Sequence, residues 1–211
     1  PRAITSVATD RTWIAGDAGR IYRTSDPTSG VTEQADGSQT SEDLYAIHAL
    51  DRNNVVAVGD NNAVLVTSNS GTVWSLVTGP APGVNLRSVA MLSQQTWFVG
   101  TADGRLFYTT NGGASWTQKG FPGQGLGEIT DIKFPSKCVG YFTHTHPTLG
   151  GRLLRTIDGG FSWNVTPEGT GLSIPANDGL NAVAVCADDV NVALVAGLAS
   201  NGTDGFAANF A

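Results

Sequence analysis

Five carboxylates lie near the starts of segments that have the pattern of β-strands, and they are the first candidates for chemistry. They are Glu42, Asp43, Glu128, Asp131 and Asp178. Two opposed carboxylates are the groups that hydrolyse a glycosidic bond. Acidic residues that enter a strand are also common as solvated turn ends. We interpret these five as structural and predict that the protein is not an enzyme, with glycosidase activity as a less favoured alternative.

His144 and His146 are the second candidates. Alternate residues of a strand point to one face, so two imidazoles at this spacing could bind one metal ion. A third ligand of suitable spacing is missing from the neighbouring sequence, and Pro147 indicates a turn. The Asp-Gly fragments likewise lack the dense oxygen ligands of a calcium loop. We therefore predict neither a metal nor a cofactor.

The candidate side chains lie in a sequence that contains a repeat, and the repeat determines which elements position them. The pattern T-x-N/D-x-G-x-x-W occurs at residues 67–74, 109–116 and 156–163, which we name the box turns, and a remnant begins at Thr24. The four threonines are 43, 42 and 47 residues apart. This spacing is typical of the four-stranded blades of a β-propeller.

Two further elements recur with the same period. Five segments pair an aliphatic residue with a β-branched one three positions later: residues 3–8, 43–48, 85–90, 128–133 and 179–184. Between these segments and the box turns, a strand, a turn rich in Gly, Asp and Asn, and a second strand form a hairpin pattern. Each repeat therefore predicts a blade of four strands.

The predicted fold is all-β, a single five-bladed β-propeller over residues 1–211 with repeats of roughly 42 residues. The blades are expected at about 3–36, 43–78, 85–119, 128–166 and 180–211. The last blade is incomplete, because no box turn and no outer Trp strand follow its third strand.

The box turns are predicted to be structural. Asn or Asp can accept hydrogen bonds from backbone N–H groups of its own loop, Gly permits a positive φ, and Trp supplies a large apolar plug. The twelve residues that carry these roles are Thr67, Asn69, Gly71, Trp74, Thr109, Asn111, Gly113, Trp116, Thr156, Asp158, Gly160 and Trp163.

These motifs resemble the Asp-box, or bacterial neuraminidase, repeat S/T-x-D-x-G-x-S/T-W. Residues 109–116 and 156–163 match nearly throughout, whereas residues 67–74 lack the Ser/Thr before Trp. The alternation of units looks most like bacterial and phage proteins related to photosystem II assembly factors. The resemblance implies a propeller whose box turns lie opposite the ligand site. The sialidase members carry an early Arg-Ile-Pro motif and an arginine triad, which the opening Pro-Arg-Ala-Ile and the unaligned arginines do not match.

The amino-acid composition limits the classes of partner that the protein is expected to bind. The net charge is −6, and only three lysines are present. Nucleic acids and anionic membranes attract positive surfaces, so we predict that the protein binds neither. Since no long apolar run and no signal core are found, we expect a protein made in the cytoplasm without a signal peptide. An excised domain is the alternative. Cys138 and Cys186 are predicted to be buried thiols, with a disulfide as the alternative.

The first strand of each blade is expected to line the propeller axis with small side chains. His48 and Lys133 are the two larger exceptions, and with Asp131 they could form a polar cluster across the axis. We interpret them as a structural ion-pair cluster rather than as catalytic groups.

Irregular loops are the predicted contact surface. Residues 143–151 and 198–205 replace short hairpin turns, and they are expected to share a rim with the linkers 78–85, 118–128 and 164–179. The candidate contact residues on this rim are His144, His146, Asn201 and Asp204.

The segment 205–211 is predicted to be an open edge strand. Its candidate contact residues are Phe206, Asn209 and Phe210. Natural proteins seldom leave the N–H and C=O groups of such an edge bare, so a partner strand or a neighbouring subunit is expected to cover it.

These features favour a non-enzymatic structural or interaction propeller. It would be a subunit or decoration protein of a larger assembly, with a tailed-phage virion as the favoured setting and capsid or tail proteins as partners. The alternative is a lectin-like propeller that binds a glycan, with Tyr45, Phe121 and Tyr141 as stacking platforms. An assembly chaperone is less favoured, because the sequence has no arginine-rich patch.

Overall fold

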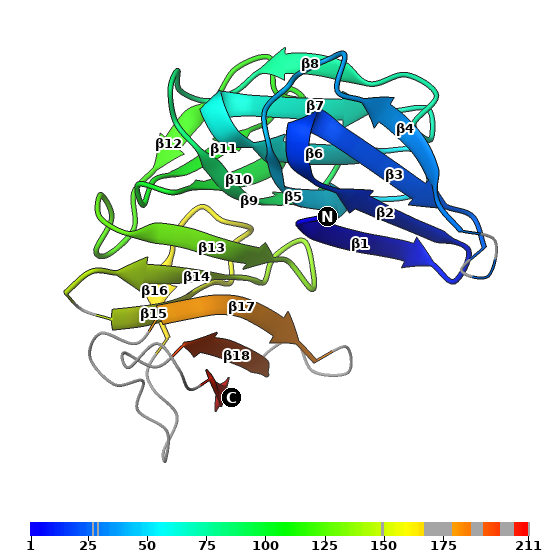
Figure 1. Ribbon diagram of the computed structural model, residues 1–211. Coiled ribbons are helices and arrows are strands. Elements are labelled where there is room, and N and C mark those ends of the chain that lie inside the picture. Colours follow the sequence, from blue (N-terminus) through cyan, green and yellow to red (C-terminus); the bar gives the residue numbers. More distant parts are fainter. Residues whose placement is uncertain are drawn as a thin grey trace. The chain divides into compact units, whose positions relative to one another are not determined.

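The computed structural model describes residues 1–26, 28, 30–148, 150–166, 179–186, 192–198 and 205–210, and for 205–210 only the backbone. These residues form five antiparallel sheets and contain no α-helix (Figure 1). The chain divides into two compact units, each described by itself. The first unit is residues 1–99 with 107–117, and the second is residues 100–106 with 118–211.

In each sheet the strands follow one another in sequence order. The first sheet consists of β1 (Ala3–Ala8), β2 (Arg11–Ala15), β3 (Arg20–Thr24) and β4 (Thr32–Asp36). The second consists of β5 (Leu44–Ala49), β6 (Val55–Gly59), β7 (Ala63–Thr67) and β8 (Ser75–Thr78). One-turn 3₁₀ segments, η1 (Asp17–Gly19) and η2 (Asp60–Asn62), close the two central hairpins.

The other three sheets repeat this order. The third has β9 (Leu86–Met91), β10 (Trp97–Thr101), β11 (Leu106–Thr109) and β12 (Thr117–Lys119). The fourth has β13 (Glu128–Lys133), β14 (Gly140–His146), β15 (Gly150–Thr156) and β16 (Asn164–Val165). In the part of the chain that the structure describes, the fifth sheet consists of β17 (Gly179–Val185), β18 (Ala193–Leu198) and β19 (Gly205–Phe210). The predicted all-β class is confirmed.

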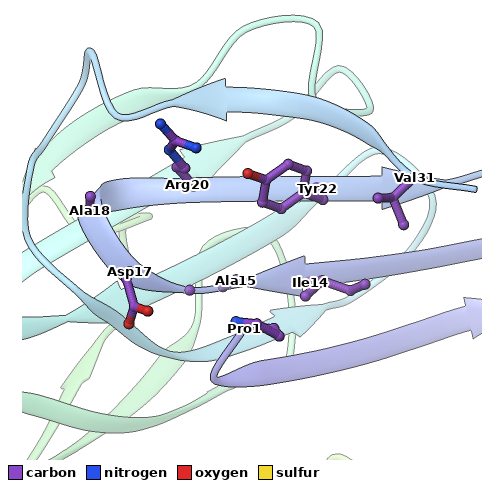
Figure 2. A pocket seen from close by; sticks show the side chains of 9 residues that line it. Pro1, Ile14, Ala15, Asp17, Ala18, Arg20, Tyr22 and Val31 are labelled. Carbon is purple, nitrogen blue, oxygen red and sulfur yellow. The ribbon is translucent and has the colours of Figure 1, made fainter.

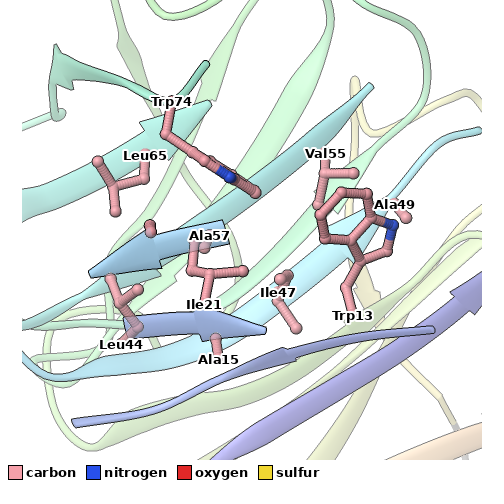
Figure 3. Packing of buried hydrophobic residues seen from close by; sticks show 11 residues of the cluster. Trp13, Ala15, Ile21, Leu44, Ile47, Ala49, Val55, Ala57, Leu65 and Trp74 are labelled. Carbon is pink, nitrogen blue, oxygen red and sulfur yellow. The ribbon is translucent and has the colours of Figure 1, made fainter. Parts of the chain in front are cut away.

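The second sheet buries both of its faces against neighbouring sheets of the first unit. Alternate residues of a strand point to opposite faces, and both faces of β6 are apolar. Val55 and Ala57 pack with Trp13 of the first sheet (Figure 3). Val56 and Val58 pack toward the third sheet. In the second unit, Tyr141 and Leu153 pack in the same way against the fifth sheet.

The box turns are closed by their own side chains. Thr156 Oγ1 accepts a hydrogen bond from the N–H of Gly160 at 2.9 Å, and Asp158 Oδ1 accepts one from the N–H of Ser162 at 2.9 Å. The equivalent bonds in the other two turns run from Gly71 N to Thr67 Oγ1, from Val73 N to Asn69 Oδ1, from Gly113 N to Thr109 Oγ1 and from Ser115 N to Asn111 Oδ1.

The glycine and the tryptophan of each box turn also contribute to its structure. Gly71, Gly113 and Gly160 have φ values of 82°, 86° and 86°, a region that favours glycine. Trp74 and Trp163 are buried, and half-buried Trp116 donates from Nε1 to the carbonyl of Thr78 at 2.9 Å. The remnant at Thr24 makes a smaller turn, in which Asp26 Oδ1 accepts from the N–H of Thr28 at 2.8 Å.

Replacing Thr156 with alanine is expected to lower the free energy of unfolding by about 1–3 kcal/mol, because the buried N–H of Gly160 loses its acceptor. Thr156→Ser keeps the hydroxyl and serves as the control, with a smaller loss expected. Chemical denaturation of the two variants beside the parent protein measures both effects. Equal losses for Ala and Ser would show that the hydroxyl contributes nothing.

Asp158 should make the stability of the protein depend on pH in the acidic range. Hydrogen bonds from the Ser162 hydroxyl and N–H hold the pKa of Asp158 down, from an ordinary 3.8 to about 2. Its contribution to stability is therefore fully present above pH 3.8 and is lost as the pH falls from 3.8 toward 2. Asp158→Asn, which copies Asn111, is expected to remove this part of the dependence. Unchanged acid denaturation in that variant would contradict the assignment.

Candidate functional site

The two histidines of the predicted rim lie in a strand rather than in a loop. β14 continues to His146, which pairs with Gly150 of β15, so residues 143–146 belong to the sheet. His144 is 0% exposed, and His146 is also buried. The prediction of a surface loop was wrong here, because the alternating T-H-T-H segment extends the hairpin and only the residues after it turn. A buried His144 is not available as a contact residue.

His144 occupies an apolar pocket of the second unit. Its Nε2 lies 2.7 Å from the carbonyl oxygen of Leu126, and its ring contacts Phe121 edge to face at 5.4 Å between centroids. Because a carbonyl only accepts, Nε2 carries the proton, and Nδ1 is buried without a hydrogen-bond partner. Burial lowers the pKa of His144 below 6.5, and the charges of His146 and Arg152 lower it further. The imidazole therefore stays neutral at pH 7.

The candidate carboxylates are held by structural contacts. In the first unit, Asp43 accepts from Arg2 at 2.8 Å and from the N–H of Ala18 at 3.0 Å. In the second unit, Asp131 Oδ1 lies 3.1 Å from Lys133 Nζ, and Oδ2 accepts from the N–H of Val183 at 3.2 Å. These contacts fix both carboxylates in place and partly neutralise them.

The remaining polar candidates are placed as follows. Glu42 Oε1 accepts from the Asn61 side chain at 3.4 Å, and Glu128 is half-buried at the start of β13. His48 Nδ1 accepts from the N–H of Met91 at 3.1 Å, within the first unit. Asp178 lies outside the described residues. Within those residues, no three His, Cys, Asp or Glu side chains are close enough to hold a metal ion.

One charged array was not predicted from the sequence. The guanidinium groups of Arg2 and Arg87 lie 4.6 and 3.9 Å from the centroid of the Tyr45 ring. Arg87 also pairs with Asp60 at 2.8 Å. The only signal was that Tyr45 and Arg87 both directly follow the first leucine of their strands. Because each arginine has an aspartate partner, the array joins three sheets of the first unit rather than forming a free anion site.

Two other predictions about side-chain environment were wrong. Phe121 and Tyr141, two of the three proposed sugar-stacking platforms, are buried against neighbouring residues. Cys138 and Cys186, expected to be buried, are exposed free thiols. Cys138 belongs to the bend before β14, and Cys186 directly follows β17, so neither side chain lies in a sheet.

The described surface of the first unit has an apolar hollow of about 580 Å³. Figure 2 shows Ile14 of β2, Tyr22 of β3 and Val31 beside it, with Asp17 and Arg20 at one end. All the lining residues belong to the first sheet or to the turns beside it.

The structure describes only part of the remaining predicted rim and edge strand. Asn201 and Asp204 lie outside the described residues, as do most of residues 164–179 and 198–205. Phe206, Asn209 and Phe210 belong to β19, where they pair with Gly197, Leu194 and Ala193 of β18.

His144 should make the protein less stable in mild acid. Since its pKa is lower in the folded than in the unfolded state, stability is full above pH 6.5 and is lost as the pH falls from 6.5 toward the folded value. Thermal unfolding between about pH 7.5 and 5 measures this loss, which His144→Gln should reduce. His48→Gln is the matched control, because His48 is not among the charges that lower the pKa of His144. An unchanged pH dependence in His144→Gln would refute the assignment.

In the described part of the chain, no helix has the length and apolar character that crossing a membrane requires. No protein-family model matches the sequence, and no curated protein does either.

Solved structures do match. The chain is similar to YCF48 from Cyanidioschyzon merolae, with 13% identity over 98% of this chain and 68% of that chain and a TM-score of 0.68. It is also similar to a GH74 enzyme from Niastella koreensis, with 19% identity, 99% and 35% coverage and a TM-score of 0.75. A GH74 xyloglucanase from Xanthomonas campestris matches with 17% identity, 98% and 36% coverage and a TM-score of 0.69.

The chain spans about a third of the length of the two GH74 enzymes. Identities this low show the fold alone. Together with the five antiparallel sheets, they show that the chain has the β-propeller fold.

Proposed function

We propose that the protein is a non-enzymatic structural and interaction propeller, a subunit or decoration protein of a larger assembly. The observation that carries this proposal is the position of β19. In the first four sheets a fourth strand pairs with the third, namely β4, β8, β12 and β16. β19 is the third strand of the fifth sheet, and no strand of the described residues pairs with its outer side.

Such an edge is suited to strand addition. A strand at the end of a sheet presents a row of N–H and C=O groups that another strand can pair with. Peptide recognition by strand addition uses these main-chain bonds for affinity and side-chain pockets for specificity. The partner we propose is therefore a protein segment in extended conformation, contributed by a neighbouring subunit.

The side chains that chemistry would need have structural partners instead. The Asp and Asn residues of the box turns accept backbone N–H groups, and Asp43 and Asp131 are paired with basic residues. The propeller fold does not distinguish an enzyme from a non-enzymatic protein, because one fold hosts many functions. YCF48 and the GH74 enzymes are different proteins, and both match this fold.

A tailed-phage virion is the setting we propose, with capsid or tail proteins as partners. Support comes from the resemblance of the repeat to bacterial and phage proteins and from the sheet edge. The net charge of −6 favours a protein partner over nucleic acid.

Removing residues 205–211 is expected to abolish assembly, because the strand that a partner would extend is lost. The full chain, expressed in its source, should sediment with a particle far larger than its own 21.9 kDa. Cross-linking mass spectrometry of that fraction should place partner peptides near residues 198–211.

Circular dichroism of the shortened protein checks that the remaining sheets fold. Retained assembly after the deletion, in a folded protein, would overturn the role of the edge. A full-length chain that sediments only as a free 21.9 kDa species would remove the basis of the proposed function.

A further inference from the structure

Two arginines of the first unit, Arg11 of β2 and Arg23 of β3, meet at the box turn of the second sheet. Arg11 Nη1 donates to the hydroxyl oxygen of Ser70 at 2.8 Å, and Arg23 Nη1 donates to the carbonyl oxygen of the same residue. The guanidinium carbon of Arg23 also lies 5.6 Å from the centroid of the Trp13 ring. The two guanidinium groups are therefore held around one residue, between the first and second sheets.

The repeat itself does not require this pair of arginines. Arg23 directly precedes the threonine that ends the third strand, and Arg11 directly precedes the residue that pairs with that threonine. The second sheet has Val66 and Asn54 at the equivalent positions. Because uncharged residues suffice there, the two arginines are an addition to the repeat rather than a condition of its folding.

The positive charges of the pair have no dedicated counter-charge. Among the residues that the structure describes, no carboxylate forms an ion pair with Arg11 or Arg23. Hydrogen bonds from Arg52 at 2.8 and 2.7 Å, and to a smaller extent the charge of Arg11, lower the pKa of Asp10, so this acid already has its own partner. Burial and the charge of Arg11 lower the pKa of Arg23 below 12.5. A bound anion would offset this repulsion.

The guanidinium groups have further donors besides those that contact Ser70. The contacts with Ser70 use Nη1 of each arginine, and Arg11 Nε is buried without a hydrogen-bond partner. The N–H groups of a guanidinium form a planar fork that matches two oxygens of one oxyanion. Both side chains are only half-buried, so part of each is accessible to a ligand. Two fixed positive charges match a phosphate group, which carries a charge of about −1.5 to −2 at pH 7, better than they match a single carboxylate.

We infer that Arg11 and Arg23 form a binding site for a phosphate group beside the box turn of the second sheet. The contacts with Ser70 hold the two guanidinium groups in place, and their remaining donors bind the phosphate oxygens. The site lies apart from β19 and goes beyond the proposed role in assembly. Free phosphate and the phosphate monoester of a larger ligand share this chemistry.

Thermal unfolding of the full chain tests the inference. Sodium phosphate, glycerol phosphate and sodium acetate are compared with sodium chloride at one ionic strength and about pH 7.5, where phosphate is mostly a dianion. Phosphate should raise the unfolding temperature with saturation, because a ligand that binds the folded state stabilises it. Acetate should have a much smaller effect than phosphate.

Arg11→Gln and Arg23→Gln should each weaken the affinity for phosphate by about tenfold or more, since each removes charged hydrogen bonds. Arg20→Gln is the matched control, because Arg20 lies in the same strand as Arg23 but is exposed and pairs with Glu33. Circular dichroism checks that each variant folds. If the Gln variants do not fold, Arg11→Lys and Arg23→Lys replace them, because lysine keeps the charge and lacks the fork, and a weaker affinity for phosphate is again expected.

The two phosphate probes distinguish the sources of the ligand. Glycerol phosphate that binds as tightly as inorganic phosphate would indicate a phosphate monoester, and binding of inorganic phosphate alone would indicate the free ion; both results support the site. The inference is overturned if phosphate stabilises the parent protein no more than chloride does, if acetate binds as tightly as phosphate, or if the arginine variants keep the parent affinity. None of these results changes the sedimentation test of the proposed function, so the two can fail separately.

Discussion

A sheet that is apolar on both faces cannot be stable in water until both faces are covered, and this constraint governs the whole chain. β6 shows it most clearly, since Val55 and Ala57 pack on one side and Val56 and Val58 on the other. Burial of apolar area is the main favourable term in folding. The three sheets of the first unit therefore stack face to face, and each stapled box turn joins the third strand of a sheet to its fourth.

The repeat spacing predicted much of this arrangement. Thr67, Thr109 and Thr156 each end a third strand, as the motif indicated. Local hydrogen bonding and strand periodicity are properties of short sequence windows, so they can be predicted from residue types. The environment of an individual side chain is different, because it depends on which distant segments pack around it. His144 was expected on a surface loop, yet Phe121 and the Leu126 carbonyl enclose it from a linker some twenty residues earlier.

The same distinction applies to the charged residues. Arg2 lies at the start of the sequence and has no motif around it, but folding places it over Tyr45 and beside Asp43. Its partners lie about one repeat later in the sequence, but the repeat pattern does not indicate that these side chains meet. The sequence likewise could not identify Cys138 and Cys186 as exposed, since both lie just outside strands, where composition says little about burial. Predictions of function from such residues are consequently less secure than predictions of fold.

The strict sequence order of strands within each sheet has a kinetic consequence. Every pairing within a sheet joins consecutive strands, so the loops that must close are short and their entropic cost is small. Folding rates rise when contacts are local. The hydrogen-bond ladders of each sheet therefore close within one repeat, and only the covering of its two faces depends on other repeats. In the first unit, a sheet that has closed its own ladders offers an apolar face on which the next sheet can pack, so the order of the sheets in the sequence is also an order in which they can be added during synthesis.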